Sequence, residues 1–202
     1  MTANLNNKCE KRKRISKEEA FSLLKEYYID IFNAYYEAID KFNIEIQQTI
    51  PEARTRLNSV LLNAKLSQSF ILHFPDNWRL GKYGRIIFRW EETGNAVQLI
   101  IKKLDEDSNP SYISTLLSDA IMNQYQMSLF KEDEAKEEPI LIFGYTKDKD
   151  GNIINPRIVY YDGEPKWVID RNDISIEMIP YSPFKSKEAE VTLRQERKKK
   201  EQ

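Results

Sequence analysis

Hydrophobic residues recur at helical spacing through most of the first fifty positions. Ser16-Lys17-Glu18-Glu19 has the spacing of a capping box, in which the serine hydroxyl and the Glu19 carboxylate each accept the other residue's backbone N–H. Apolar side chains then follow in steps of three and four residues, from Phe21 to Ile46. This period is typical of an amphipathic helix, and it predicts one long helix over residues 16–50.

A helix of that length needs a partner, because helices of globular proteins average about 11 to 12 residues. Pro51 ends the first helix and suits the first turn of a second one, whose apolar stripe includes Leu57, Val60, Leu61 and Ala64. Packing between these two helices within one chain is the first expectation. A homodimer that pairs through helix 16–50 is the alternative.

The hydrophobic period changes from helical to alternating at Tyr83, which predicts a β-hairpin. Ile86, Phe88 and Trp90 share one face of the first strand. The chain turns at Thr93-Gly94-Asn95, and a second strand returns with the same alternation as far as residue 104.

A third helix is predicted after Asn109-Pro110, with an apolar stripe from Ile113 to Tyr125. Residues 131–138 form a charged connector, and three further strands follow at 140–146, 153–161 and 167–170. The turns between them, Asp150-Gly151-Asn152 and Asp162-Gly163, have sequences typical of tight hairpins.

Together these elements predict an α+β fold: an antiparallel sheet of about five strands, made of a hairpin and a three-stranded meander, backed by helices. The long N-terminal helix is part of this prediction. The expected organisation is a basic, disordered leader at residues 1–15, a single α+β domain at 16–181, and a polar, flexible tail at 182–202. Within the domain, residues 16–50 form the long helix and residues 51–181 the core.

The composition fits a folded intracellular protein. Hydrophobic residues make up 41% and aromatic residues 11% of the 202 positions, which is enough apolar surface for a core. No run of about 18 apolar residues occurs, and the first twenty residues lack an apolar stretch of signal-peptide length. We therefore expect a cytosolic protein that does not enter a membrane.

Few residues are available for familiar catalytic or metal chemistry. The chain has one histidine, His73, and one cysteine, Cys9, far apart in sequence, so neither a zinc site nor an internal disulfide is expected. Six glycines do not form a phosphate-binding loop, and no serine elbow accompanies His73. The sequence predicts no cofactor and no metal.

A metal-dependent nuclease is the main enzymatic alternative. Such a site needs carboxylates at the end of one strand and an acid-x-Lys pattern on the next. Glu91-Glu92 and Lys102-Lys103 end the two predicted hairpin strands, but Ile100-Ile101 stand two positions before the lysines. Asp105-Glu106-Asp107 can supply carboxylates beyond the strand, so a divergent nuclease stays open as an alternative.

Charge is segregated along the chain, although the net charge is only -1. Residues 51–103 carry nine Lys/Arg and four Asp/Glu, a local +5, whereas residues 104–150 carry four and eleven, a local -7. Basic residues at the second helix and the hairpin can meet where helix and sheet join, and guanidinium groups near a helix N-terminus suit carboxylates or phosphates. The predicted binding residues are Arg54, Arg56, Arg79, Lys82, Arg85, Arg89, Lys102 and Lys103.

An acidic protein and nucleic acid are both candidate partners for such a surface. The sequence pI near 6.0 lies far below the value above about 9 that is typical of DNA-binding domains, and no recognition motif is present. The basic segments 11–14 and 197–200 can add nonspecific phosphate contacts. We therefore expect a protein partner first and keep nucleic acid as the alternative.

Several short motifs resemble a family of small bacterial proteins encoded in prophages and mobile elements, often beside a repressor and a metallopeptidase. The resemblance covers about residues 53–170 and implies a regulatory or defence-associated role. The matching segments are Ala53-Arg54-Thr55-Arg56, Lys102-Lys103-Leu104-Asp105, Gln124, Gly144-Tyr145 with Asp148 and Gly151, and Trp167.

The predicted function is accordingly a non-enzymatic binding or regulatory protein of a bacterial or phage module, regulatory or toxin-antitoxin-like. It would bind an anionic partner through the second helix and the hairpin. Two alternatives stand beside it: the divergent metal-dependent nuclease, and an assembly protein that pairs through the long first helix.

Overall fold

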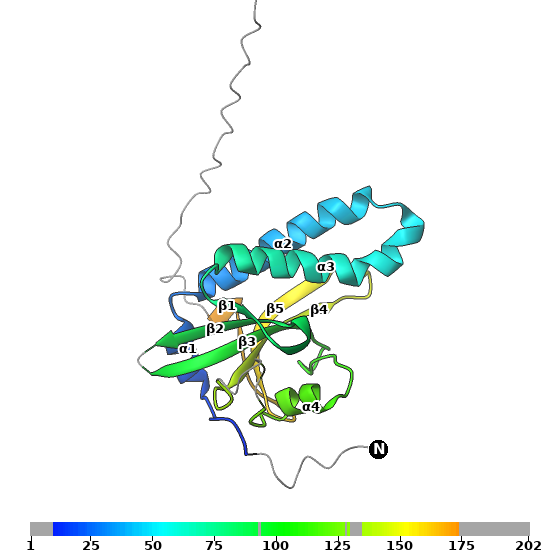
Figure 1. The fold of residues 1–202 in the computed structure, drawn as a ribbon. Helices are drawn as coiled ribbons and strands as arrows, with labels where there is room; N and C mark the ends of the chain where they lie inside the picture. Colours follow the sequence, from blue (N-terminus) through cyan, green and yellow to red (C-terminus); the bar gives the residue numbers. More distant parts are fainter. Residues whose placement is uncertain (1–9, 93, 128, 130–134, 174–202) are drawn as a thin grey trace, which may run out of the picture.

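The computed structural model describes residues 10–92, 94–127, 129 and 135–173, and they form an α+β fold (Figure 1). Three helices precede the first strand: α1 (Lys17–Leu24), α2 (Tyr28–Gln48) and α3 (Pro51–His73). A fourth, α4 (Leu116–Met122), lies between the third and fourth strands. The strands are β1 (Trp78–Leu80), β2 (Ile86–Glu92), β3 (Asn95–Lys103), β4 (Ile140–Lys147), β5 (Ile153–Tyr161) and β6 (Pro165–Asp170).

The six strands form one mixed sheet in the order β1-β2-β3-β4-β5-β6, so the prediction of a purely antiparallel sheet of about five strands was wrong. All neighbouring strands are antiparallel except β3 and β4, which run parallel with Leu99 beside Leu141. Parallel neighbours need a crossover connection, and the segment that carries α4 provides it. The predicted hairpin is confirmed, with Trp90 opposite Val97, and the unpredicted β1 is only three residues long.

Helices cover both faces of the sheet. Phe88, Leu99 and Phe143 belong to the core that α1, α2 and α3 share with one face. The alternate residues, such as Ile100 and Ile142, belong to a second core. That core lies on the face of the sheet where α4 is found, opposite α2 and α3 (Figure 1). A strand buried on both faces needs apolar side chains at consecutive positions, which explains the uninterrupted burial of β4 from Ile140 to Thr146.

The predicted long helix over residues 16–50 is two helices. The capping box is present at Ser16 and Glu19, but α1 ends at Leu24 and α2 begins at Tyr28. Between them Tyr27 N–H donates to Leu24 O at 2.8 Å, a three-residue bond that tightens the turn. The apolar spacing of three and four residues continues across the break, so the hydrophobic period alone could not reveal it. Among the described helices, none has the length and apolar content needed to cross a membrane.

The third predicted helix starts later than expected. Pro110 forms a β-bridge with Leu104 instead of opening a helix, and Asp105 accepts the backbone N–H of Asn109 in the loop between them. The helix begins only after Thr115, whose hydroxyl accepts the N–H of Ser118. It is seven residues long, because the preceding segment stays extended against the end of β3.

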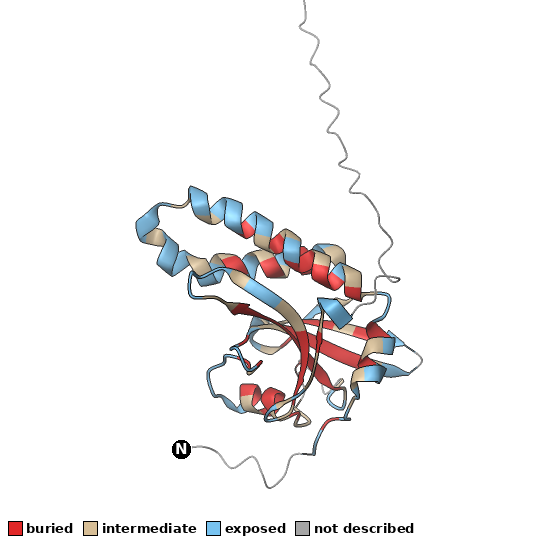
Figure 2. Cartoon of the chain, turned by 180° about the vertical axis from the view of Figure 1, so that it is seen from behind, coloured by how far each residue is buried: buried red, intermediate tan, exposed pale blue. Residues whose placement is uncertain are grey.

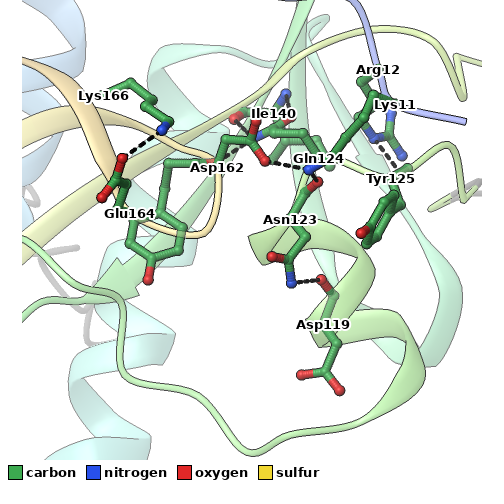
Figure 3. A network of polar contacts seen from close by, with 11 residues as sticks. Lys11, Arg12, Asp119, Asn123, Gln124, Tyr125, Ile140, Asp162, Glu164 and Lys166 are labelled. Atoms are coloured by element: carbon green, nitrogen blue, oxygen red, sulfur yellow. Dashed lines mark hydrogen bonds and ion pairs between the residues drawn. The ribbon is translucent and has the colours of Figure 1, made fainter. Parts of the chain in front are cut away.

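Part of the predicted disordered leader is fixed to the sheet. Arg12 is 3% exposed, and its guanidinium donates to the carbonyl oxygens of Tyr125, Met127, Ala135 and Glu138. Its backbone N–H also donates to Gln124 O at 2.7 Å, so residues 10–15 lie beside the segment after α4 (Figure 3). The predicted tail at 182–202 lies outside the described residues.

Candidate functional site

The parallel strands β3 and β4 end at the same edge of the sheet, and both end in lysine. Lys102 is paired with Gly144 and Lys103 with Tyr145, while Lys147 ends β4. On the far side of β4, Gly144 is paired with Arg157 of β5. Arg85, just before β2, completes the group. We call Arg85, Lys102, Lys103, Lys147 and Arg157 the cationic edge.

Arg85 and Lys102 lie on the α4 face and influence each other. The alternation of the strands places them on the same face as Ile87 and Ile100, which are buried on the α4 side. Burial lowers the pKa of the Lys102 ammonium, and the charge of Arg85 lowers it further. Burial also lowers the pKa of Arg85, whose Nη1 is buried without a hydrogen-bond partner in the described part of the chain.

Arg157 extends this group across the sheet. Its Nη1 donates to Ser108 Oγ at 2.9 Å, while its Nε is buried with no partner in the described residues. Gly144 separates it from Lys102 in the strand register, and the Leu104 side chain occupies the space above that glycine. Lys102 and Arg157 therefore stand on either side of Gly144 in the strand register, with no carboxylate side chain between them.

The other two lysines face α3. Lys147 Nζ donates to Asn58 Oδ1 at 2.9 Å, which brings the end of β4 to the first half of α3. Burial lowers the pKa of Lys147, and the nearby charge of Lys103 adds to that effect. Lys103 and Lys147 thus form a second pair of like charges, where α3 meets the ends of β3 and β4.

No side chain of the cationic edge forms an ion pair with a carboxylate of the described residues. Arg89 shows the contrasting case. Its guanidinium binds Glu138 at 2.7 Å and Glu91 at 2.8 Å, and the hydrogen bond to Glu138 is the main cause of its raised pKa. Arg89 is therefore neutralised by two carboxylates. The cationic edge has no such pairing among the described residues, although the charge of Arg157 contributes to the lowered pKa of Asp105.

The structure gathers three of the eight predicted binding residues, Arg85, Lys102 and Lys103, at this edge. Arg54 instead donates to the carbonyl oxygens of Gln47 and Thr49, both at 2.9 Å, and closes the end of α2. The remaining predicted residues lie elsewhere: Arg56 is exposed on α3, Arg79 is on β1, Lys82 is in the turn before β2, and Arg89 is paired.

Sequence reasoning missed Lys147 and Arg157. Lys147 directly follows the strand predicted at 140–146, and Arg157 lies in the middle of the strand predicted at 153–161. Their proximity to Lys102 depends on the parallel pairing of β3 with β4, which the hydrophobic pattern does not encode. A lysine at the end of each parallel neighbour is the signal that would have found the site.

A cavity of about 340 Å³ adjoins the cationic edge, between α3, the start of β2 and the last residues of β3. Asn63 and Ser67 of α3, Tyr83 and both Arg85 and Lys102 are among its lining residues. Its other walls include Leu66, Ile86, Phe88 and Ile101. Tyr83 is exposed and has a φ of 59°, a left-handed conformation that non-glycine residues seldom adopt and that often marks a functional turn.

Two acidic loops flank the edge and have the same geometry. Asp105 accepts the backbone and side-chain N–H groups of Asn109 at 2.8 and 3.0 Å. Asp148 accepts the same two groups of Asn152, both at 2.8 Å. The hydrogen bonds from asparagine lower the pKa of each aspartate. These two carboxylates are therefore engaged within their own loops.

The residues proposed for metal chemistry do not form a metal centre. In the described parts of the chain, no three His, Cys, Asp or Glu side chains lie together in a way that could hold a metal ion. Asp105 is held by Asn109, and His73 contacts Glu37 at 3.3 Å between α3 and α2. Cys9 lies outside the described residues.

Comparison with known proteins finds no matching family model, no matching curated protein and no matching solved structure. The resemblance to mobile-element proteins and the cytosolic location both stay predictions.

Proposed function

We propose that this chain is a non-enzymatic binding protein whose cationic edge takes an acidic segment of a protein partner, within a regulatory or toxin-antitoxin-like module of a cytosolic bacterial or phage system. The observation that carries the proposal is the pair Arg85 and Lys102: two adjacent, partly buried cations without an ion pair in the described residues.

Partly buried charges of like sign are unfavourable until a counter-charge arrives. Burial removes the water that stabilises each cation, and the neighbouring cation adds repulsion, so a carboxylate placed between them relieves both effects. The Arg85 guanidinium offers a planar fork that binds a carboxylate with two hydrogen bonds, and Lys102 supplies a point charge. Lys103, Lys147 and Arg157 can engage further acidic side chains of the same segment.

An acidic protein segment fits this edge better than nucleic acid. A duplex carries one charge per about 1.7 Å along its axis and needs a continuous basic surface. The acidic loops that begin at Asp105 and Asp148 interrupt such a surface here, and Arg89 is already neutralised. The partly apolar cavity beside Arg85 and Lys102 can also hold an apolar side chain next to the bound carboxylate.

The test uses two labelled probes, a ten-residue peptide of alternating glutamate and phenylalanine and a 20-base-pair DNA duplex, with binding followed by fluorescence anisotropy. The full chain is expected to bind the peptide at low salt. An Arg85→Gln, Lys102→Gln variant is expected to bind it at least about tenfold more weakly, since one charged hydrogen bond is worth about 1.5 to 3 kcal/mol.

Lys166→Gln is the matched control, because Lys166 is an exposed lysine on β6 that pairs with Glu164 at 2.7 Å. It should leave peptide binding unchanged. Tighter binding of the duplex than of the peptide would replace the acidic partner with nucleic acid. Absence of peptide binding, or equal weakening by Lys166→Gln, would refute the site.

A further inference from the structure

The α2–α3 hairpin extends past the sheet at the end where the two helices connect (Figure 1). Large apolar side chains are exposed at this end: Ile44 is 61%, Ile50 66%, Leu57 43% and Val60 67% exposed. In Figure 2 this end is coloured largely as exposed, in contrast to the part of the hairpin over the sheet. Exposed apolar side chains gathered on one projecting element are typical of an interaction surface.

The two helices are also joined to each other at the hairpin end. Arg54 of α3 donates to the last carbonyl groups of α2, and Lys65 forms an ion pair with Glu45 across the two helices. These bonds hold the two helices in place at the hairpin end, so the exposed apolar side chains lie on an ordered surface. A partner that binds this preformed surface loses less conformational entropy on association.

The charges of the two helices are opposite. α2 carries four Asp/Glu and one Lys, a net -3, whereas α3 carries three Lys/Arg and one Glu, a net +2 with His73 neutral. Asp40 and Arg56 are exposed and form no ion pair with other described residues. The positive α3 of a second copy is therefore attracted to the negative α2 of the first copy. In a two-fold symmetric dimer, α2 of the second copy then contacts α3 of the first as well.

We propose that a second copy of this chain docks on the hairpin end, so that α2 of each copy packs against α3 of the other. The apolar side chains of Ile44, Leu57 and Val60 would form the centre of the contact, and the opposite charges would set its orientation. This surface adjoins the proposed acidic-segment site, because Lys147 of the cationic edge contacts Asn58 of α3. It involves both helices, not the single long helix that the hydrophobic pattern predicts.

Sedimentation equilibrium of the full chain over a range of concentrations tests this proposal. The unmodified chain is expected to be a dimer, and a Leu57→Glu, Val60→Glu variant to be a monomer with an unchanged circular dichroism spectrum. Ile113→Glu is the matched control, since Ile113 is an exposed apolar residue before α4. A monomeric unmodified chain at every concentration, or equal dissociation of the control, would overturn the proposal.

Charge reversal tests the orientation of the two copies. Asp40→Lys alone and Arg56→Glu alone should each weaken the dimer, because each places like charges across the contact. The double variant should restore dimerisation, since the opposite charges are then exchanged between the helices. If the double variant associates no better than the single variants, the α2-against-α3 arrangement is wrong.

Discussion

Gln124 and Ile140 are joined by a reciprocal pair of hydrogen bonds in the interior of the protein. Gln124 Nε2 donates to Ile140 O at 2.8 Å, and Ile140 N–H donates back to Gln124 Oε1 at 3.0 Å (Figure 3). The same Nε2 also donates to Tyr161 O at 2.8 Å. The buried amide thus connects the first residue of β4 with the last residue of β5, where the two strands no longer pair directly.

Replacing Gln124 with alanine is expected to lower the free energy of unfolding by about 3 kcal/mol. Each buried backbone group that loses its partner costs about 1 to 3 kcal/mol, and three such groups are affected. Urea denaturation measures the loss. Gln126→Ala is the control, because the Gln126 side chain donates to the exposed carbonyl of Lys11 and should contribute less than about 1 kcal/mol. Equal losses in the two variants would show that burial of the Gln124 amide does not matter.

Arg12→Ala is expected to destabilise the fold by about 3 kcal/mol and to release the leader. The substitution leaves the carbonyl oxygens of Tyr125, Met127, Ala135 and Glu138 without the guanidinium that binds them. Thermal unfolding measures the stability, and limited proteolysis reports cleavage before α1. Arg12→Lys should not restore either property, since an ammonium cannot reach the same four carbonyls as a planar fork. Arg14→Ala, at an exposed position, should leave both unchanged.

The local elements were predictable from the sequence because their signals are local. The hairpin that places Trp90 opposite Val97 follows from alternation on both sides of a turn, and the capping box at Ser16 is a four-residue pattern. The parallel pairing of β3 with β4 was not predictable in this way. It depends on a 36-residue crossover, in which Asp105 and Asn109 hold a loop where the pattern suggested a helix start.

The candidate site was predictable only in part, for the same reason. Lys102 and Lys103 stand out in the sequence as the basic end of a strand, and Arg85 directly precedes Ile86, the first residue of β2. Lys147 and Arg157 join them only through strand pairings that are distant in sequence. Conversely, Arg54 looked available for binding, but the end of α2 offers unpaired carbonyl groups that its guanidinium satisfies.

Stability is expected to fall in acid partly because of the two asparagine-bound aspartates. Hydrogen bonds lower the folded-state pKa of Asp105 and Asp148, so the stability that they add is complete above the unfolded-state pKa of about 3.9. It is lost as the pH falls through the lower, folded-state pKa. Asp148→Asn should lower the Tm near neutral pH.

The difference in Tm between Asp148→Asn and the unmodified chain should become smaller as the pH falls, because protonated Asp148 no longer binds Asn152 as an anion. Thermal unfolding at a series of pH values between about 7 and 2 measures the gap. Asp150→Asn, in the same loop, is the control, because the hydrogen bonds from Asn152 go to Asp148 and not to Asp150; the difference in Tm between this variant and the unmodified chain should stay constant. A gap for Asp148→Asn that stays constant across this range would contradict the assigned hydrogen bonds.

Gly144→Ala is expected to destabilise the fold through Leu104. A Cβ at Gly144 would overlap the Leu104 side chain, and overpacking of this kind costs about 1 to 3 kcal/mol. Leu104→Ala alone should also destabilise, by about 2 to 5 kcal/mol, because it leaves a cavity in the α4-side core. The double variant should lose less unfolding free energy than the sum of the two single losses, since the smaller side chain makes room for the new methyl group. Urea denaturation of the four proteins should give a coupling free energy of about 0.5 to 3 kcal/mol.

Gly151→Ala is the control. Its φ of 86° makes the substitution unfavourable, but open space surrounds the residue, so Leu104→Ala should not offset the loss of stability. Strict additivity of Gly144→Ala and Leu104→Ala would mean that Leu104 does not set the size limit at Gly144.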